Sequence, residues 1–114
     1  NGPSFNAKKL IDNLLKNKYI ITIIFVYLHS IEESLERIKN RVQKGGHNIP
    51  FKDIIRRFPR SIKNFWNNYR LNVNKWEIIY NSKSESLLIA VGNSTTQTIF
   101  NENIFSKFKE IVNG

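Results

Sequence analysis

The spacing of apolar residues along the chain predicts helices in some segments and buried strands in others. Over residues 7–16 apolar side chains recur every three or four positions, which predicts a short amphipathic helix that Asn17 and Lys18 end. Residues 19–28 (YIITIIFVYL) are β-branched and aromatic, without alternating polar positions. Such a run is typical of a strand covered on both faces in a parallel sheet. Residues 75–80 (KWEIIY) predict a second strand.

The middle of the chain predicts two helices joined by a loop. Ser30 begins the first helix, and Glu33, three residues later, completes a capping box. The loop spans residues 45–50 (GGHNIP), whose glycines end that helix. Over residues 51–69 apolar side chains again recur at spacings of three and four, so one face of a second helix is apolar. Pro59 lies inside this segment and is expected to kink or split the helix.

The last third of the chain predicts a hairpin and a closing helix. Residues 87–91 and 96–100 flank a Gly-Asn turn signal, and residues 101–112 have an amphipathic helical pattern. Helices that alternate with buried strands predict an α/β fold, in which a short parallel sheet carries helices on its faces. At 114 residues the chain is expected to form a single domain over residues 1–114.

Charge narrows the range of partners. The chain holds 18 lysines and arginines against 9 acidic residues, a net charge of +9. Residues 37–75 alone hold eleven of these cations and one acid. This excess predicts a polyanionic partner, such as nucleotide phosphates, nucleic acid or an acidic protein surface.

Several classes of protein are excluded by composition. The chain has no cysteine, which excludes a disulfide framework and a thiolate metal site and is compatible with a cytoplasmic location. Its longest apolar run is about ten residues, whereas a membrane-spanning helix needs roughly 20, so no membrane association is expected. It also has no methionine, so we expect it to be part of a longer protein.

Arginines gather on both sides of the 45–50 loop. Arg41 precedes the loop, while Arg56 and Arg60 lie one helical turn apart after it, with Arg57 beside them. The planar guanidinium group donates paired hydrogen bonds to phosphate oxygens, so two arginine faces joined by this loop could close on a phosphate. A solvated basic face that keeps the protein soluble explains the same residues equally well.

His47 lies in the same loop, between Gly46 and Asn48. A histidine there could bind phosphate or transfer a proton, although local hydrogen bonding that shapes the loop is the commoner role. A metal site is not expected, because the chain has only two histidines and no acidic cluster accompanies them.

Residues 36–61, in which GGHNIP precedes the arginines, resemble a signature of zeta-toxin-like P-loop kinases. Residues 25–38 (FVYLHSIEESLERI) resemble the strand and helix before this motif, and residues 75–82 (KWEIIYNS) resemble the strand after it. The resemblance covers roughly residues 4–92. It implies part of a P-loop NTPase-like three-layer fold, with a lid-like region over about residues 37–70.

The resemblance also implies an activity. The family uses ATP and Mg²⁺ to phosphorylate a small hydroxyl substrate, which in the toxins proper is a UDP-N-acetyl amino sugar. By this resemblance Arg41, Arg56, Arg57 and Arg60 belong to a lid that contacts the nucleotide phosphate, and His47 lies in its loop.

The chain lacks the phosphate-binding sequence G-x-x-x-x-G-K-S/T. We therefore expect it to be inactive alone, to bind neither ATP nor Mg²⁺ tightly, and to need a separate P-loop-bearing segment.

Two other classes of function remain open. A nucleic-acid-binding module would use the helix from residue 51 to 71, with Trp66 and Tyr69 stacking on bases. An interaction module would pair with an acidic, antitoxin-like protein.

Self-association is a further expectation. The 19–28 strand is too apolar to face water, and the sequence lacks the strand that lies beside it in a P-loop kinase and leads into the phosphate loop. A homodimer would cover it. Alternatively, residues 87–114 fold back over the gap.

Overall fold

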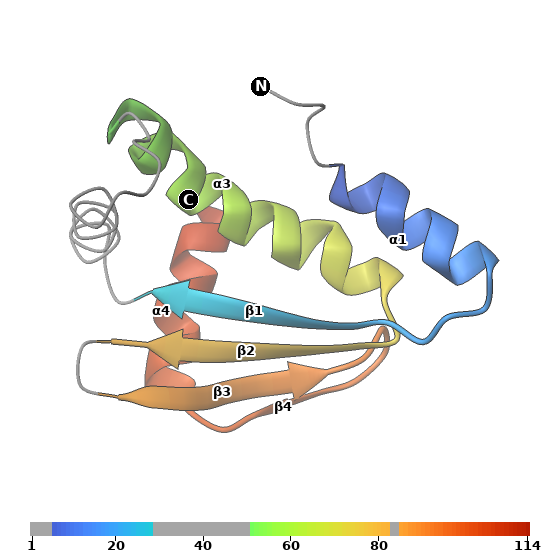
Figure 1. Ribbon diagram of the computed structural model, residues 1–114. Helices are drawn as coiled ribbons and strands as arrows, with labels where there is room; N and C mark the ends of the chain where they lie inside the picture. Colours follow the sequence, from blue (N-terminus) through green and yellow to red (C-terminus); the bar gives the residue numbers. More distant parts are fainter. Residues whose placement is uncertain (1–5, 29–50, 83–84) are drawn as a thin grey trace.

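The computed structural model describes residues 6–28, 51–82 and 85–114, which form a four-stranded sheet and three helices (Figure 1). The side chains of residues 51–55 lie outside this description. In chain order the elements are α1 (Ala7–Lys16), β1 (Thr22–Leu28), α3 (Phe51–Asn67), the 3₁₀ turn η1 (Tyr69–Asn72), β2 (Lys75–Asn81), β3 (Ser86–Gly92), β4 (Gln97–Ile99) and α4 (Glu102–Asn113). No described helix has the length and apolar character needed to cross a bilayer.

The two terminal helices begin where asparagine side chains cap them. The Asn6 side chain accepts a hydrogen bond from the Lys9 backbone N–H, and the Asn101 side chain accepts one from Ile104, each at 3.0 Å. Such caps satisfy N–H groups that have no partner within the helix. α1 ends at Lys16, and two residues later Lys18, with a φ of 65°, lies in the left-handed region. The helices predicted over residues 7–16 and 101–112 are both confirmed.

The sheet has the strand order β1-β2-β3-β4 and mixed direction. β1 pairs with β2 in parallel, with Phe25 opposite Ile78, whereas β2–β3 and β3–β4 are antiparallel. The strand predicted at residues 75–80 and the hairpin formed by residues 87–91 and 96–100 are confirmed. The α/β class is also correct, but the sheet is only partly parallel, because β3 and β4 pair in antiparallel directions.

The β3–β4 hairpin turns around one side chain. The Asn93 Oδ1 atom accepts hydrogen bonds from the backbone N–H groups of Thr95 and Thr96, at 2.9 and 2.8 Å. Asparagine favours turns because its short side chain can bond to the backbone two or three residues ahead. The Asn93 carbonyl oxygen in turn accepts a hydrogen bond from the Trp76 indole N–H at 3.2 Å, which fixes the turn to the core.

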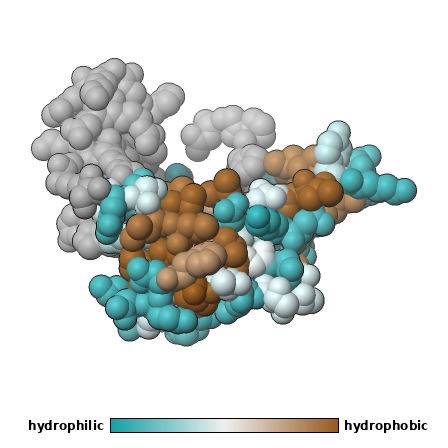
Figure 2. Space-filling view, turned by 90° about the horizontal axis from the view of Figure 1, so that it is seen from below, coloured by the Kyte–Doolittle hydropathy of each residue, from teal (hydrophilic) through white to brown (hydrophobic). Residues whose placement is uncertain are grey.

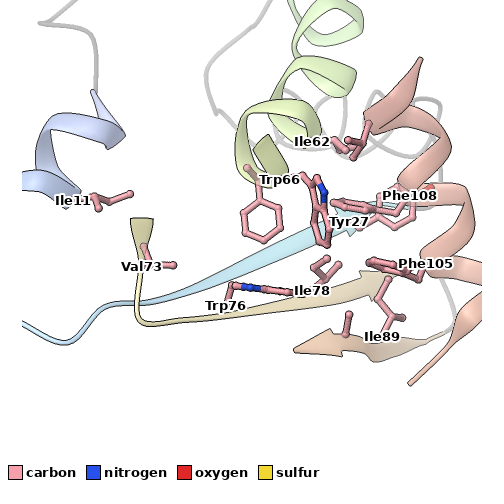
Figure 3. Close-up of a cluster of buried hydrophobic side chains, with 13 residues drawn as sticks. Ile11, Tyr27, Ile62, Trp66, Val73, Trp76, Ile78, Ile89, Phe105 and Phe108 are labelled. Carbon is pink, nitrogen blue, oxygen red and sulfur yellow. The ribbon is translucent and has the colours of Figure 1, made fainter. Parts of the chain in front are cut away.

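The core lies on one face of the sheet, beneath α3 and α4 (Figure 3). Trp76, Ile78 and Ile89 contribute fully buried side chains from β2 and β3. The helices contribute mostly aromatic side chains, and Phe65 and Trp66 of α3 meet the Trp76 ring edge-to-face, as ring quadrupoles prefer. The buried aromatic residues are Tyr27, Phe65, Trp66, Trp76, Phe105 and Phe108.

α3 runs alongside β1, and α4 crosses behind the strands in the view of Figure 1. α3 continues as one helix through Pro59, so the alternative that this residue splits it is wrong. Phe58 and Ile62, on either side of the proline, both pack into the core and hold the two halves in line.

The other face of the sheet is covered by no described helix, so the described residues form two layers rather than the expected three. Ile24, Val26 and Leu88 are 56%, 48% and 42% exposed there. Seen from below, Figure 2 shows hydrophobic residues gathered in parts of the surface, with hydrophilic ones around them. Burial alternates along β1, so the expectation that both of its faces are covered is wrong for these residues. The expected helix at Ser30 lies outside the described residues.

Replacing Gly92 with alanine should destabilise the protein. A Cβ atom there would lie 2.5 Å from the Trp76 Cζ2 atom and 2.6 Å from the Thr96 carbonyl oxygen, and neither can move freely. Overpacking of this kind typically costs about 1–3 kcal/mol, which denaturant unfolding would measure. Ser94→Ala, in the same exposed turn, should change stability by less than about 0.5 kcal/mol. Equal effects of the two substitutions would contradict the close approach.

Candidate functional site

A cleft of about 540 Å³ opens between α3 and β1. α3 supplies its polar wall, and β1, η1 and α1 supply much of its apolar surface. The lining residues are Ala7, Ile23, Phe25, Arg57, Arg60, Ser61, Asn64, Phe65 and Tyr69. Mostly apolar clefts with a few convergent polar groups are where small ligands usually bind, so this cleft is the candidate site.

The polar wall is a single stripe along α3. Relative to Arg57, the other three polar residues, Arg60, Ser61 and Asn64, stand three, four and seven positions later. Positions at these spacings share one side of an α-helix. The apolar stripe of the same helix, which includes Ile62 and Phe65, is buried. Burial of that stripe therefore turns the polar stripe toward the cleft.

The floor of the cleft is aromatic and rigid. The rings of Phe25 and Phe65 stack with their centroids 4.6 Å apart and an angle of 19° between their planes. Phe65 is 2% exposed and also meets Trp76 and Phe108 edge-to-face. Because the floor belongs to the core, a ligand would meet a surface that is already in place, and the apolar surroundings would strengthen its bonds to nearby charges.

The two arginines of the wall have free hydrogen-bonding capacity. Arg57 and Arg60 are exposed, and neither forms a hydrogen bond or ion pair with another described residue. Each guanidinium carries five N–H donors in a planar fork. The cleft therefore combines two cations with an apolar floor, an arrangement suited to an anionic ligand that also has an apolar or ring-shaped part.

Two of the five residues predicted from the sequence line this cleft. Arg57 and Arg60 line the cleft, whereas Arg56 is exposed on α3 outside the lining. Arg41 and His47 lie outside the described residues. Sequence reasoning missed Asn64, although its spacing from Arg57 and Arg60 was a usable signal. It also missed Phe25 as part of the floor, because nothing local to β1 indicates that α3 packs beside it.

A second group of cations surrounds Trp66. The Arg70 guanidinium lies 3.8 Å from the centroid of the indole ring and the Lys109 ammonium lies 4.4 Å from it. Burial lowers the pKa of Arg70; burial and, second, the charge of Arg70 lower the pKa of Lys109. Trp66 itself is only 6% exposed. Its ring is thus occupied by core packing and cation–π contacts, which disfavours the stacking of nucleic-acid bases on it.

Tyr27 lies on β1 beside Tyr80 and Phe108. Burial raises the pKa of its hydroxyl, and the nearby Tyr80 and Glu110 raise this pKa further. The group therefore stays neutral well into alkaline conditions and acts as a core residue.

The described residues hold no group of three or more histidine, cysteine or acidic side chains that could bind a metal ion. The cleft lining in particular has no carboxylate. Mg²⁺ prefers oxygen ligands, including carboxylates, so the residues of the cleft do not fit it.

No protein-family model, curated protein or solved structure matches the chain. The relation to zeta-toxin-like kinases therefore rests on the sequence motif alone, and the cleft is the structural feature that bears on function.

The cleft arginines should contribute little to folding. Because Arg57 and Arg60 are exposed and have no described partner, replacing both with alanine should change the free energy of unfolding by less than about 0.5 kcal/mol each. Phe65→Ala, which empties the floor, should cost about 3–5 kcal/mol. Urea unfolding of the three proteins measures this. A double arginine variant as unstable as Phe65→Ala would show that the arginines hold the fold together.

Proposed function

We propose that the chain is the lid-bearing carboxy-terminal portion of an ATP-dependent small-molecule kinase of the zeta-toxin-like kind. In this proposal Arg57 and Arg60 bind a phosphate group of the nucleotide. The observation that carries it is the pair of exposed guanidinium groups at the wall of an aromatic-floored cleft. The motif that resembles the kinase family contains these same two arginines.

The chemistry of phosphate transfer explains the use of arginine. A transferring phosphoryl group spreads negative charge over three oxygens, and the enzyme mainly positions the group and stabilises this charge. Two guanidinium groups one turn apart on a rigid helix can each donate paired hydrogen bonds to those oxygens. Because the helix is fixed by its buried stripe, the backbone positions from which the two arginines extend stay in place when the charge develops.

The floor supports a ligand that joins a phosphate to a planar ring. Phe25, Phe65 and Tyr69 present apolar and aromatic surface within the same cleft as the arginines. A nucleotide has both parts: a base that packs on apolar surface and phosphates that pair with cations. The described residues of the cleft provide neither the P-loop nor ligands for Mg²⁺, so a separate segment that carries them is part of this proposal.

Binding of a phosphate to the cleft should be weak and dependent on salt. Amide chemical shifts would be followed by NMR while inorganic phosphate or ATP is added at low and at physiological salt, where charges are screened within about 8 Å. Shifts should centre on Arg57, Arg60 and Asn64. They should vanish in the Arg57→Ala plus Arg60→Ala variant. They should persist in Lys8→Ala plus Lys107→Ala, which removes equal charge from exposed positions elsewhere. If both variants lose the chemical-shift changes equally, the arginines belong to a solvated basic face that has no specific phosphate site.

The chain alone should not transfer phosphate. Because the P-loop sequence is lacking, we expect ATP turnover in the presence of Mg²⁺ to equal the buffer background. A coupled assay for ADP release would measure it. Turnover above background that disappears on Arg57→Ala would instead indicate a phosphate site that works without a P-loop.

A further inference from the structure

The two edges of the sheet differ in how they are protected. β4, at one end, has only three residues, and short edge strands resist pairing with other chains. β1, at the other end, has seven residues (TIIFVYL) with no charge and no proline, the usual devices that protect an edge. Among the described residues no strand pairs with its outer side. Within the described part of the chain, the outer side of β1 therefore has no backbone partner.

A groove runs along this edge beneath α3. A smaller cavity of about 60 Å³ adjoins the main cleft, and both are lined by Phe25 and Ser61. Ile23 and Phe25 of β1 line the main cleft, and the consecutive residues Phe25, Val26, Tyr27 and Leu28 line the smaller cavity. The groove thus follows the direction of β1. An added strand would place every second side chain into it, because side chains alternate between the faces of a strand.

The two ends of the groove differ in chemistry. The main cleft, near Ile23, carries Arg57 and Arg60, whereas the smaller cavity, near Tyr27, is lined by Phe58 and Ile62. On the opposite face of the sheet, Ile24 and Val26 are half exposed and would contact the remaining side chains of an added strand. An occupant that matches these surfaces is apolar along most of its length and carries a carboxylate opposite the arginines.

We propose that β1 binds an extended segment of an acidic partner protein by strand addition. The backbone of the segment pairs with the free side of β1, its apolar side chains enter the Phe58–Ile62 end of the groove, and a carboxylate pairs with Arg57 and Arg60. A second copy of the chain, expected from the sequence, fits less well because it brings the same net charge of +9 to the interface. The proposal goes beyond phosphate binding and does not depend on it.

The experiment uses two synthetic seven-residue peptides of alternating valine and threonine. One carries two glutamates near one end, and the other carries two lysines at the same positions. Hydrogen exchange of the β1 amides is measured by NMR. The acidic peptide should slow exchange of the outward-facing β1 amides about tenfold when about nine-tenths of the protein is bound. The basic peptide should leave this exchange unchanged.

Charge reversal tests the contribution of the arginines. In Arg57→Glu plus Arg60→Glu the preference should invert, so that the basic peptide slows exchange and the acidic one does not. Lys8→Glu plus Lys107→Glu, with the same change in net charge at other exposed sites, should still prefer the acidic peptide. A preference that inverts equally in both variants would overturn the pairing with the cleft arginines.

Two further outcomes would overturn strand addition. One is tight peptide binding that leaves β1 exchange unchanged. The other is that exchange of the β1 amides slows without any peptide as the protein concentration rises, while sedimentation equilibrium shows a dimer over the same range. That result would mean that a second copy of the chain pairs with β1. Phosphate binding is measured separately, since a phosphate ion has no backbone with which to protect β1. Either proposal can therefore fail while the other holds.

Discussion

The buried indole of Trp76 is the contact on which the arrangement of the other elements depends. Its ring lies against Gly92 at the end of β3, and its N–H bonds to Asn93 in the following turn. Its ring also meets Phe65 and Trp66 of α3 edge-to-face, at 6.2 and 5.4 Å. One side chain thus joins the central strand, the hairpin and the long helix. Because a helix has a fixed period, anchoring Phe65 and Trp66 sets the direction of every other residue on α3.

The position of the cleft follows from this anchoring. With Phe65 held in the core, the polar stripe on the adjacent side of the helix faces the flank beside β1. It consists of Asn64, directly before Phe65, and of Arg60 and Arg57, one to two turns earlier. Packing and ligand recognition are thus properties of neighbouring stripes on a single helix. The arginines need no interactions of their own to be positioned, which leaves their charges available to a ligand.

Local signals in the sequence were sufficient for most of the described helices and strands and insufficient for their assembly. The helices at residues 7–16 and 101–112 and the hairpin at Gly92 follow from spacing, caps and turn residues, all of which are encoded within a few positions. The partly open β1 was missed because an apolar strand has the same sequence whether one face or both are covered. Clustering in the sequence identified Arg57 and Arg60, but the aromatic floor required Phe25, which lies more than thirty positions away and is brought there by the sheet.

The shortness of β4 limits how the sheet can grow. Chains that aggregate into fibres need two competent edges, so that each unit added at one side offers a template at the other. Here the far edge ends in three residues, with the polar Gln97 and Thr98 among them. A polymer in which β1 of one copy pairs with β4 of the next is therefore disfavoured. The length of one three-residue strand thus restricts how copies of this sheet can join, although the apolar β1 lies at the opposite edge.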